Sequence, residues 1–113
     1  MSGAPIDSFK ALAHPTRFAV LQSLIGKERN VGEIEEATGI AQPGLSQQLA
    51  VLRNSRLVTT RRDAKLVYYS LNTELFVDLA AILAQFGPVD DANIPPAVKR
   101  RFTTGVATFA RMG

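Results

Sequence analysis

The sequence has 113 residues, of which 46% are hydrophobic and 20% are charged, and its formal net charge is +3. This length allows one domain with one core, and the apolar fraction is typical of a globular chain rather than a disordered one. No apolar run approaches the roughly 18 residues that a membrane span needs, and no secretory signal begins the chain, so we expect a cytoplasmic protein without a membrane partner.

The residues that usually carry catalysis or hold metals are scarce. Cysteine is absent and His14 is the only histidine. Disulfides, thiolate metal ligands and Cys–His catalysis are therefore excluded. There is also no GxSxG motif, no phosphate loop and no clustered set of carboxylates. We expect neither an enzyme nor a metal site nor a cofactor, and we interpret His14 as part of a helix-breaking turn.

The first part of the chain predicts two short helices. The segment SFKALA forms a helix that Asp7 or Ser8 caps, and it ends at His14 because a residue before proline avoids the α region. We expect Thr16 to cap the next helix and Gly26 to end it.

A third helix is expected over VGEIEEATG, where Val31, Ile34 and Ala37 share one buried stripe. The glutamates between them face water, and Gly39 makes the turn that follows.

Leu45, Leu49 and Leu52 form the inward stripe of a fourth helix. Because successive residues are about 100° apart, Gln47 points almost directly away from that stripe.

Two strands and a long apolar helix follow. The alternation of Val67, Tyr69 and Leu71 predicts a strand, which pairs with the preceding segment LVTTRRD through a turn at residues 63–64. The helix covers residues 73–86, and its apolar surface is too broad for a solvated outer helix.

Positive charge is concentrated between the fourth helix and the hairpin. Residues 53–65 carry five basic side chains and one acidic side chain, a net charge of +4, whereas the residues before them sum to −1 and those after them to 0. Such a patch suits phosphate. A helix that can enter the DNA major groove beside a basic hairpin is the layout of a winged helix-turn-helix.

The predicted fold is mainly α with a β-hairpin wing, a winged helix-turn-helix in the order α-α-α-α-β-β-α, plus an extra C-terminal helix. Residues 1–87 would form the DNA-binding and dimerisation domain. Residues 88–113 would be a C-terminal extension, helical after the prolines at 95–96 and packed on the dimer; a frayed tail is the alternative.

Three segments in this order, ALAHPTR, AQPGLSQQLAVLR and RRDAKLVYYSL, resemble the ArsR/SmtB family of bacterial winged-helix repressors. The resemblance covers about residues 8–86. It implies a homodimer that binds a near-palindromic operator in double-stranded DNA and is released by an effector, with the second segment as the recognition helix and the third as the wing.

The departures from the family concern sensing. Many relatives carry a Cys-Val-Cys metal motif where this chain has residues 30–32, and persulfide-responsive relatives have a cysteine at the position of Gln22. The effector is therefore unknown, and it is not a thiolate-bound metal. The effector could be a metal held by carboxylates, an apolar small molecule or a protein.

Another departure from the family concerns helix stability. Ala41 replaces a common capping serine, which would cost around 1 kcal/mol of helix stability.

The candidate DNA-binding residues lie on the recognition helix and the wing: Gln42, Pro43, Gly44, Ser46, Gln47, Gln48, Arg53, Arg61, Arg62 and Lys65. Glutamine can read adenine through two hydrogen bonds, serine can contact base or phosphate, and the wing cations suit phosphate or the minor groove. The alternatives are a solvated helix face and a solubilising hairpin tip. Structural pairing is an equal alternative for Arg53 and Arg56, as capping or an internal salt bridge is for Arg17.

The candidate dimer interface consists of apolar residues from the first and last core helices: Phe9, Leu12, Leu75, Leu79, Ile82, Leu83 and Phe86. A core helix within the monomer is the alternative for residues 73–86. The sequence thus predicts a sequence-specific, homodimeric transcriptional repressor. A constitutive DNA-binding architectural or protein-interaction module without a small-molecule switch is the second hypothesis.

Overall fold

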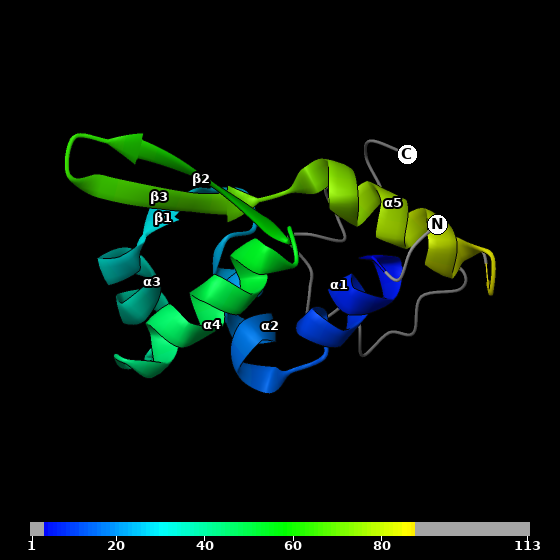
Figure 1. Cartoon of the computed structure of the whole chain (residues 1–113), viewed down its shortest axis with the longest axis horizontal. Helices are drawn as coiled ribbons and strands as arrows, with labels where there is room; N and C mark the ends of the chain where they lie inside the picture. Colours follow the sequence, from blue (N-terminus) through cyan, green and yellow to red (C-terminus); the bar gives the residue numbers. More distant parts are fainter. Residues whose placement is uncertain (1–3, 88–113) are drawn as a thin grey trace. The chain divides into compact units, whose positions relative to one another are not determined.

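The helices and strands follow one another in the order expected for a winged helix-turn-helix (Figure 1). The structure is a computed structural model that describes residues 4–87. The elements are α1 (Ala4–Leu12), α2 (Pro15–Ser23), β1 (Arg29–Asn30), α3 (Val31–Thr38), α4 (Gly44–Asn54), β2 (Val58–Asp63), β3 (Leu66–Leu71) and α5 (Thr73–Ala84). The predicted fold class is confirmed, with β1 as an addition. The helix expected after residues 95–96 lies outside the described residues.

The chain divides into two compact units, Met1–Leu79 and Ala80–Gly113. The first unit contains the helices and strands up to the middle of α5. In the second unit, the described residues are the last turn of α5 and the segment that ends at Gly87. No helix described between residues 4 and 87 is long and apolar enough to cross a bilayer.

The core of the first unit is built on the leucine stripe of α4. Leu45, Leu49 and Leu52 are at most 2% exposed, as their spacing predicts. Leu57 and Ile34 are fully buried beside them. Because each such side chain contributes about 1.5–3 kcal/mol when buried, this stripe fixes which face of α4 is turned outward.

The three strands form an antiparallel sheet in the order β1-β3-β2. In the hairpin, Thr60 lies opposite Tyr69 and Arg61 lies opposite Tyr68. Residues directly opposite share a face, and successive residues alternate between faces. The face that contains Tyr69 packs into the core, since Tyr69 is 8% exposed.

The hairpin turn lies one residue later than predicted. Asp63 is still paired in the ladder with Leu66, so the turn consists of Ala64 and Lys65. Ala64 has a φ of 57°, the left-handed conformation that glycine or asparagine adopts more readily. Because no glycine marks the position with positive φ, the sequence alone does not fix the position of this turn.

Two of the predicted helix caps are wrong. The first helix already begins at Ala4, so Asp7 and Ser8 lie within it, and Ser8 is 3% exposed. In α2, Thr16 is not the cap; its N–H group donates to Nδ1 of His14, 3.2 Å away. His14 therefore has a capping role at this turn, and Pro15 begins the helix.

The ends of α3 follow the sequence more closely. Asn30 and Glu33 form a reciprocal capping box, with both hydrogen bonds 2.9 Å long, and Gly39 ends the helix with a φ of 74°. Ala37 is exposed, so its predicted place on the buried stripe is wrong. Thr38 is half-buried instead and its hydroxyl donates to the carbonyl of Ile34, 2.7 Å away.

Two further helix boundaries differ from the prediction. The second helix ends at Ser23 rather than at Gly26, which lies in the following turn with a φ of 77°. The last described helix ends at Ala84 rather than at Phe86, and Asn72 caps its start by accepting the N–H of Leu75 at 3.3 Å.

Candidate nucleic-acid interface

The outward face of α4 carries short polar side chains. Ser46 and Gln47 are exposed, because the leucine stripe occupies the opposite side of the helix. Pro43 is also exposed, and Gly44, half-buried, has open space where a Cβ would be. The open face of this helix is therefore the one that the leucine spacing predicts. Gln47 lies on it, and its amide group can both donate and accept hydrogen bonds.

Gln42 holds the start of this helix. Its Oε1 accepts the backbone N–H of Ser46 at 2.9 Å. The expected loss of a cap at Ala41 is thus compensated by the neighbouring side chain. The side-chain oxygen of Gln42 accepts this hydrogen bond, so its Nε2 group remains as a donor for another partner.

Gln48 lies at the inner margin of α4 and contacts another helix. Its Oε1 accepts a hydrogen bond from Nη1 of Arg17 at 2.8 Å. The Nε of Arg17 donates to the carbonyl of Ala11 at 2.6 Å. Arg17 therefore makes internal hydrogen bonds that join the end of α1, the start of α2 and α4.

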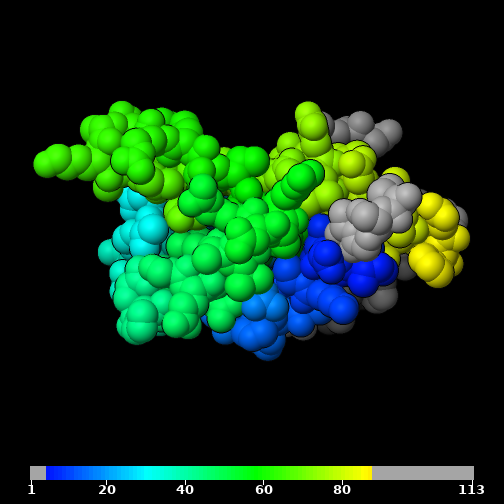
Figure 2. All heavy atoms as spheres, in the orientation of Figure 1, coloured from blue at the N-terminus to red at the C-terminus, as the bar shows by residue number. Residues whose placement is uncertain are grey.

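The hairpin carries cations with very different surroundings. The side chains of Arg62 and Lys65 are exposed and make no hydrogen bond or ion pair with another described residue, and the same holds for the side chain of Arg53 at the end of α4. Figure 2 shows the tip of this hairpin (green, at the left) protruding beyond the helices beside it. These charges are open to a phosphate group.

Arg61, by contrast, is paired within the chain. Its Nε donates to both carboxylate oxygens of Glu28, at 2.9 and 3.1 Å, and its Nη2 contacts Oε1 of the same carboxylate. Its guanidinium carbon lies 4.8 Å from the ring centroid of Tyr68, and Nη1 is 3.9 Å from Oδ2 of Asp63. The hydrogen bonds from Arg61 lower the pKa of Glu28 below its ordinary value.

Sequence reasoning missed Glu28. It is 33 residues from Arg61, and no local spacing connects the two. The register of the sheet brings them together, because β1 lies on the other side of β3 from β2.

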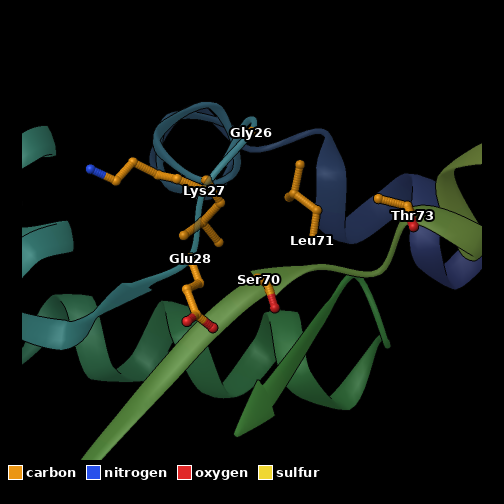
Figure 3. Close-up of a pocket in the computed structure, with 7 residues that line it drawn as sticks. Gly26, Lys27, Glu28, Ser70, Leu71 and Thr73 are labelled. Carbon is orange, nitrogen blue, oxygen red and sulfur yellow. The ribbon is translucent and has the colours of Figure 1, made fainter.

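A shallow hollow of about 210 Å³ lies beside Glu28 (Figure 3). Its lining comes from the turn after α2, the end of β3 and the start of α5: Leu24, Gly26, Lys27, Glu28, Ser70, Leu71 and Thr73. None of the predicted DNA-binding residues lines it. Among the residues that the structure describes, no three His, Asp or Glu side chains are grouped so as to hold a metal ion.

The predicted dimer residues fall into two sets. Leu79 is 3% exposed, and Phe9, Leu12 and Leu75 pack against the same core, so these four residues stabilise their own chain. Further along, Ile82 is half-buried, whereas Leu83 is 53% exposed and Phe86 is 87% exposed. Ile6 and Val77, at 58% and 61%, are exposed apolar residues that the sequence analysis did not single out.

A family model, relatives of known sequence and solved structures all relate this chain to one family of bacterial proteins. The family described as "Bacterial regulatory protein, arsR family" matches residues 14–60. The chain is 50% identical over 62 residues to the biofilm growth-associated repressor of Xylella fastidiosa, an alignment that covers 55% of this chain and 54% of that protein. The chain thus spans about half the length of this relative.

A longer match is with the nodulation protein NolR of Rhizobium meliloti, 39% identical over 83 residues, 73% of this chain and 68% of that protein. The crystal structure of the transcriptional repressor BigR from Xylella fastidiosa superposes with a TM-score of 0.59 at 39% identity, covering 75% of this chain and 87% of that one. The matched family is described as regulatory and two of these proteins are named as repressors, in agreement with the prediction that the chain is not an enzyme. The chain belongs to the arsR family of bacterial regulatory proteins.

Proposed function

We propose that this chain is a homodimeric transcriptional repressor that binds a near-palindromic operator in double-stranded DNA in the cytoplasm. The observation that carries the proposal is the open polar face of α4 next to a protruding hairpin on which Arg62 and Lys65 have no described partner. The polar face would read base edges in the major groove, and the hairpin cations would hold the backbone. Relatives named as repressors support the same role.

In a dimer, each chain would supply one recognition helix. Two such helices bind half-sites about one helical turn of DNA apart, roughly 34 Å. We therefore expect the preferred duplex to contain two related half-sites with that separation. The salt dependence of binding reports the number of phosphates contacted, so affinity should fall steeply as salt rises.

The first test is a fluorescence anisotropy titration of the full chain with a duplex from upstream of its own gene and with random-sequence duplexes, at several salt concentrations. A preference for one duplex together with a steep salt dependence supports the proposal. Affinity that does not change with salt, or equal affinity for all duplexes, contradicts it.

Single substitutions can distinguish residues that recognise bases from residues that contact the DNA backbone. Gln47→Ala should relax base preference at one position of each half-site by roughly 1–3 kcal/mol. Arg62→Ala should weaken binding to all sequences and make the salt slope shallower by about 0.9 per lost phosphate contact. The measurement is the affinity of each variant for a panel of single-base operator variants.

Two substitutions elsewhere serve as matched controls. Gln22→Ala removes an exposed glutamine from α2, and Lys10→Ala removes an exposed cation from α1. Both should leave the base preference and the salt slope unchanged. If Gln47→Ala and Arg62→Ala gave the same profile, the division between reading and holding would be wrong.

We further propose that release from DNA does not use thiolate ligands, because the chain has no cysteine to supply them. An effector must bind the free protein better than the complex, since equal affinity for both states shifts nothing. Arsenite, zinc, cadmium and a persulfide donor should each leave the preformed complex intact. Stoichiometric release by one of these reagents would contradict the proposal.

A further inference from the structure

Arg61 and Arg62 follow one another on β2 but lie on opposite faces of the sheet. Arg62 is opposite Val67, on the face whose inner residues Val58 and Tyr69 are buried against the helices. Arg61 is opposite Tyr68, on the other face. Because successive strand residues alternate, only one of the two arginines can lie on the side that carries the recognition helix.

The surroundings of Arg61 already neutralise its charge. Glu28 accepts hydrogen bonds from Nε and Nη2, Asp63 lies 3.9 Å from Nη1, and Tyr68 lies beneath the guanidinium group. Two carboxylates thus surround one cation, and the local net charge is −1. An approaching phosphate would be repelled by this cluster, whereas Arg62 offers it an unpaired charge.

The Glu28–Arg61 pair also connects two different parts of the fold. Glu28 comes directly before β1, which leads without a break into α3, and Arg61 lies near the free end of the hairpin. The side chain of Arg61 extends from β2 across Tyr68 of β3 to reach Glu28. The contact therefore ties the protruding hairpin to the strand that precedes the helix-turn-helix.

We propose that Glu28 and Arg61 form a brace that fixes the position of the wing, so that Arg61 is a positioning residue and Arg62 and Lys65 contact the phosphates. This inference rests on the proposed function, which it deepens. It assigns opposite roles to two adjacent arginines. It also assigns a role in DNA affinity to Glu28, a negatively charged residue.

The sign of the Glu28→Gln effect distinguishes a brace from a simple electrostatic contribution. Removing a negative charge from a DNA-binding protein should by itself tighten binding. If Glu28 holds the wing, the same substitution should weaken binding about two- to fivefold, the range expected for loss of a partly exposed ion pair. Glu36→Gln removes the same charge from an exposed position on α3 and should not weaken binding.

The experiment compares the full-length wild type with Glu28→Gln, Arg61→Gln, Arg62→Gln and the charge-swapped double variant Glu28→Arg/Arg61→Glu. Affinity for the preferred duplex is measured against salt concentration. We expect Arg61→Gln to weaken binding with an unchanged salt slope and Arg62→Gln to reduce the slope by about 0.9. The affinity of the charge-swapped variant should lie within about twofold of the wild-type affinity, because the ion pair can also form with the two charges exchanged.

Two results would overturn the brace: tighter binding by Glu28→Gln, or a salt slope that Arg61→Gln reduces as much as Arg62→Gln does. A measurement without DNA keeps the inference separate from the proposed function. Backbone ¹⁵N relaxation should show greater mobility of residues 61–66 in Glu28→Gln than in the wild type or in the charge-swapped variant. A wild type that prefers no duplex would contradict the proposed function. Residues 61–66 that are equally mobile in Glu28→Gln and in the wild type would contradict the brace, whatever the result with DNA.

Discussion

At the scale of single residues, the function of a charge in this chain depends on what lies beside it. The side chain of Arg61 has Glu28, Asp63 and Tyr68 as neighbours, whereas the side chain of Arg62 has no hydrogen-bond or ion-pair partner among the described residues. Both are arginines of one strand, and both were candidates for DNA contact. The difference between them comes from the alternation of side chains across the sheet and from a contact between distant segments.

The contact with Arg61 also affects the pKa of Glu28. Hydrogen bonding from Arg61 holds that pKa below its ordinary value of 4.5. A lowered carboxylate pKa adds stability above the ordinary value, and this stability is lost as the pH falls through the lowered pKa. We therefore expect the pair to persist at pH 4.5 and to open only below it.

An NMR titration of the Glu28 side-chain carboxyl carbon tests this expectation. In the wild type the midpoint should lie below 4.5, and in Arg61→Gln it should move upward toward 4.5. Arg62→Gln is the control and should leave the midpoint where it is in the wild type. Equal midpoints in the wild type and in Arg61→Gln would show that the pair does not form in solution.

At the scale of the elements, the parts that the sequence predicted well are those set by local periodicity. The stripe of Leu45, Leu49 and Leu52 and the alternation of Tyr69 with its neighbours each require only a few adjacent residues, and both lie where expected. The open face of α4 followed from the same stripe. The outward position of Gln47 could therefore be predicted without any knowledge of the rest of the fold.

The parts that the sequence did not reveal depend on contacts between distant segments. The strand β1 has only two residues, too few to show alternation, and exists because β3 pairs with it. The hydrogen bond from Arg17 to Gln48 joins residues 31 positions apart. Because threonine is a common cap, the sequence predicts Thr16 as the cap of α2, whereas the side chain of His14 takes that role.

The capping box of α3 leads to a prediction at this scale. Asn30 accepts the N–H of Glu33 and thereby satisfies one of the open donors at the start of the helix. Asn30→Ala should lower the free energy of unfolding by about 1 kcal/mol. Asn30→Asp keeps an acceptor at the same place and should retain most of the stability.

Urea denaturation of both variants checks this prediction, with the slope of the transition confirming that unfolding remains two-state. If Asn30→Ala and Asn30→Asp were equally stable, the cap would contribute nothing measurable. The start of α3 would then be held by packing of the helix, including the burial of Ile34, and not by the cap.

At the scale of the whole molecule, the proposed dimer requires apolar surface that a single chain leaves exposed. Leu79 does not provide it, since it is 3% exposed and belongs to the core of its own chain. Leu83 near the end of α5 is 53% exposed, and Phe86 in the turn that follows is 87% exposed. The predicted interface therefore depends on this later part of the segment.

The substitution that tests dimerisation must leave the core intact. Leu79→Asp would place a charge among buried side chains and would unfold the chain, so it cannot distinguish a monomer from a denatured protein. Leu83→Asp changes an exposed residue and should leave the fold unchanged. Because the interface of a two-fold dimer presents the same patch from both chains, one substitution introduces two charges into it.

We expect Leu83→Asp to be a folded monomer in sedimentation equilibrium at concentrations where the wild type is a dimer, with an unchanged circular dichroism spectrum. Its affinity for a duplex with two half-sites should fall toward its affinity for one half-site, since the second recognition helix is no longer linked to the first. Ile25→Asp is the matched control, because Ile25 is 49% exposed and lies outside the predicted interface. A dimeric Leu83→Asp variant with full affinity would place the interface elsewhere.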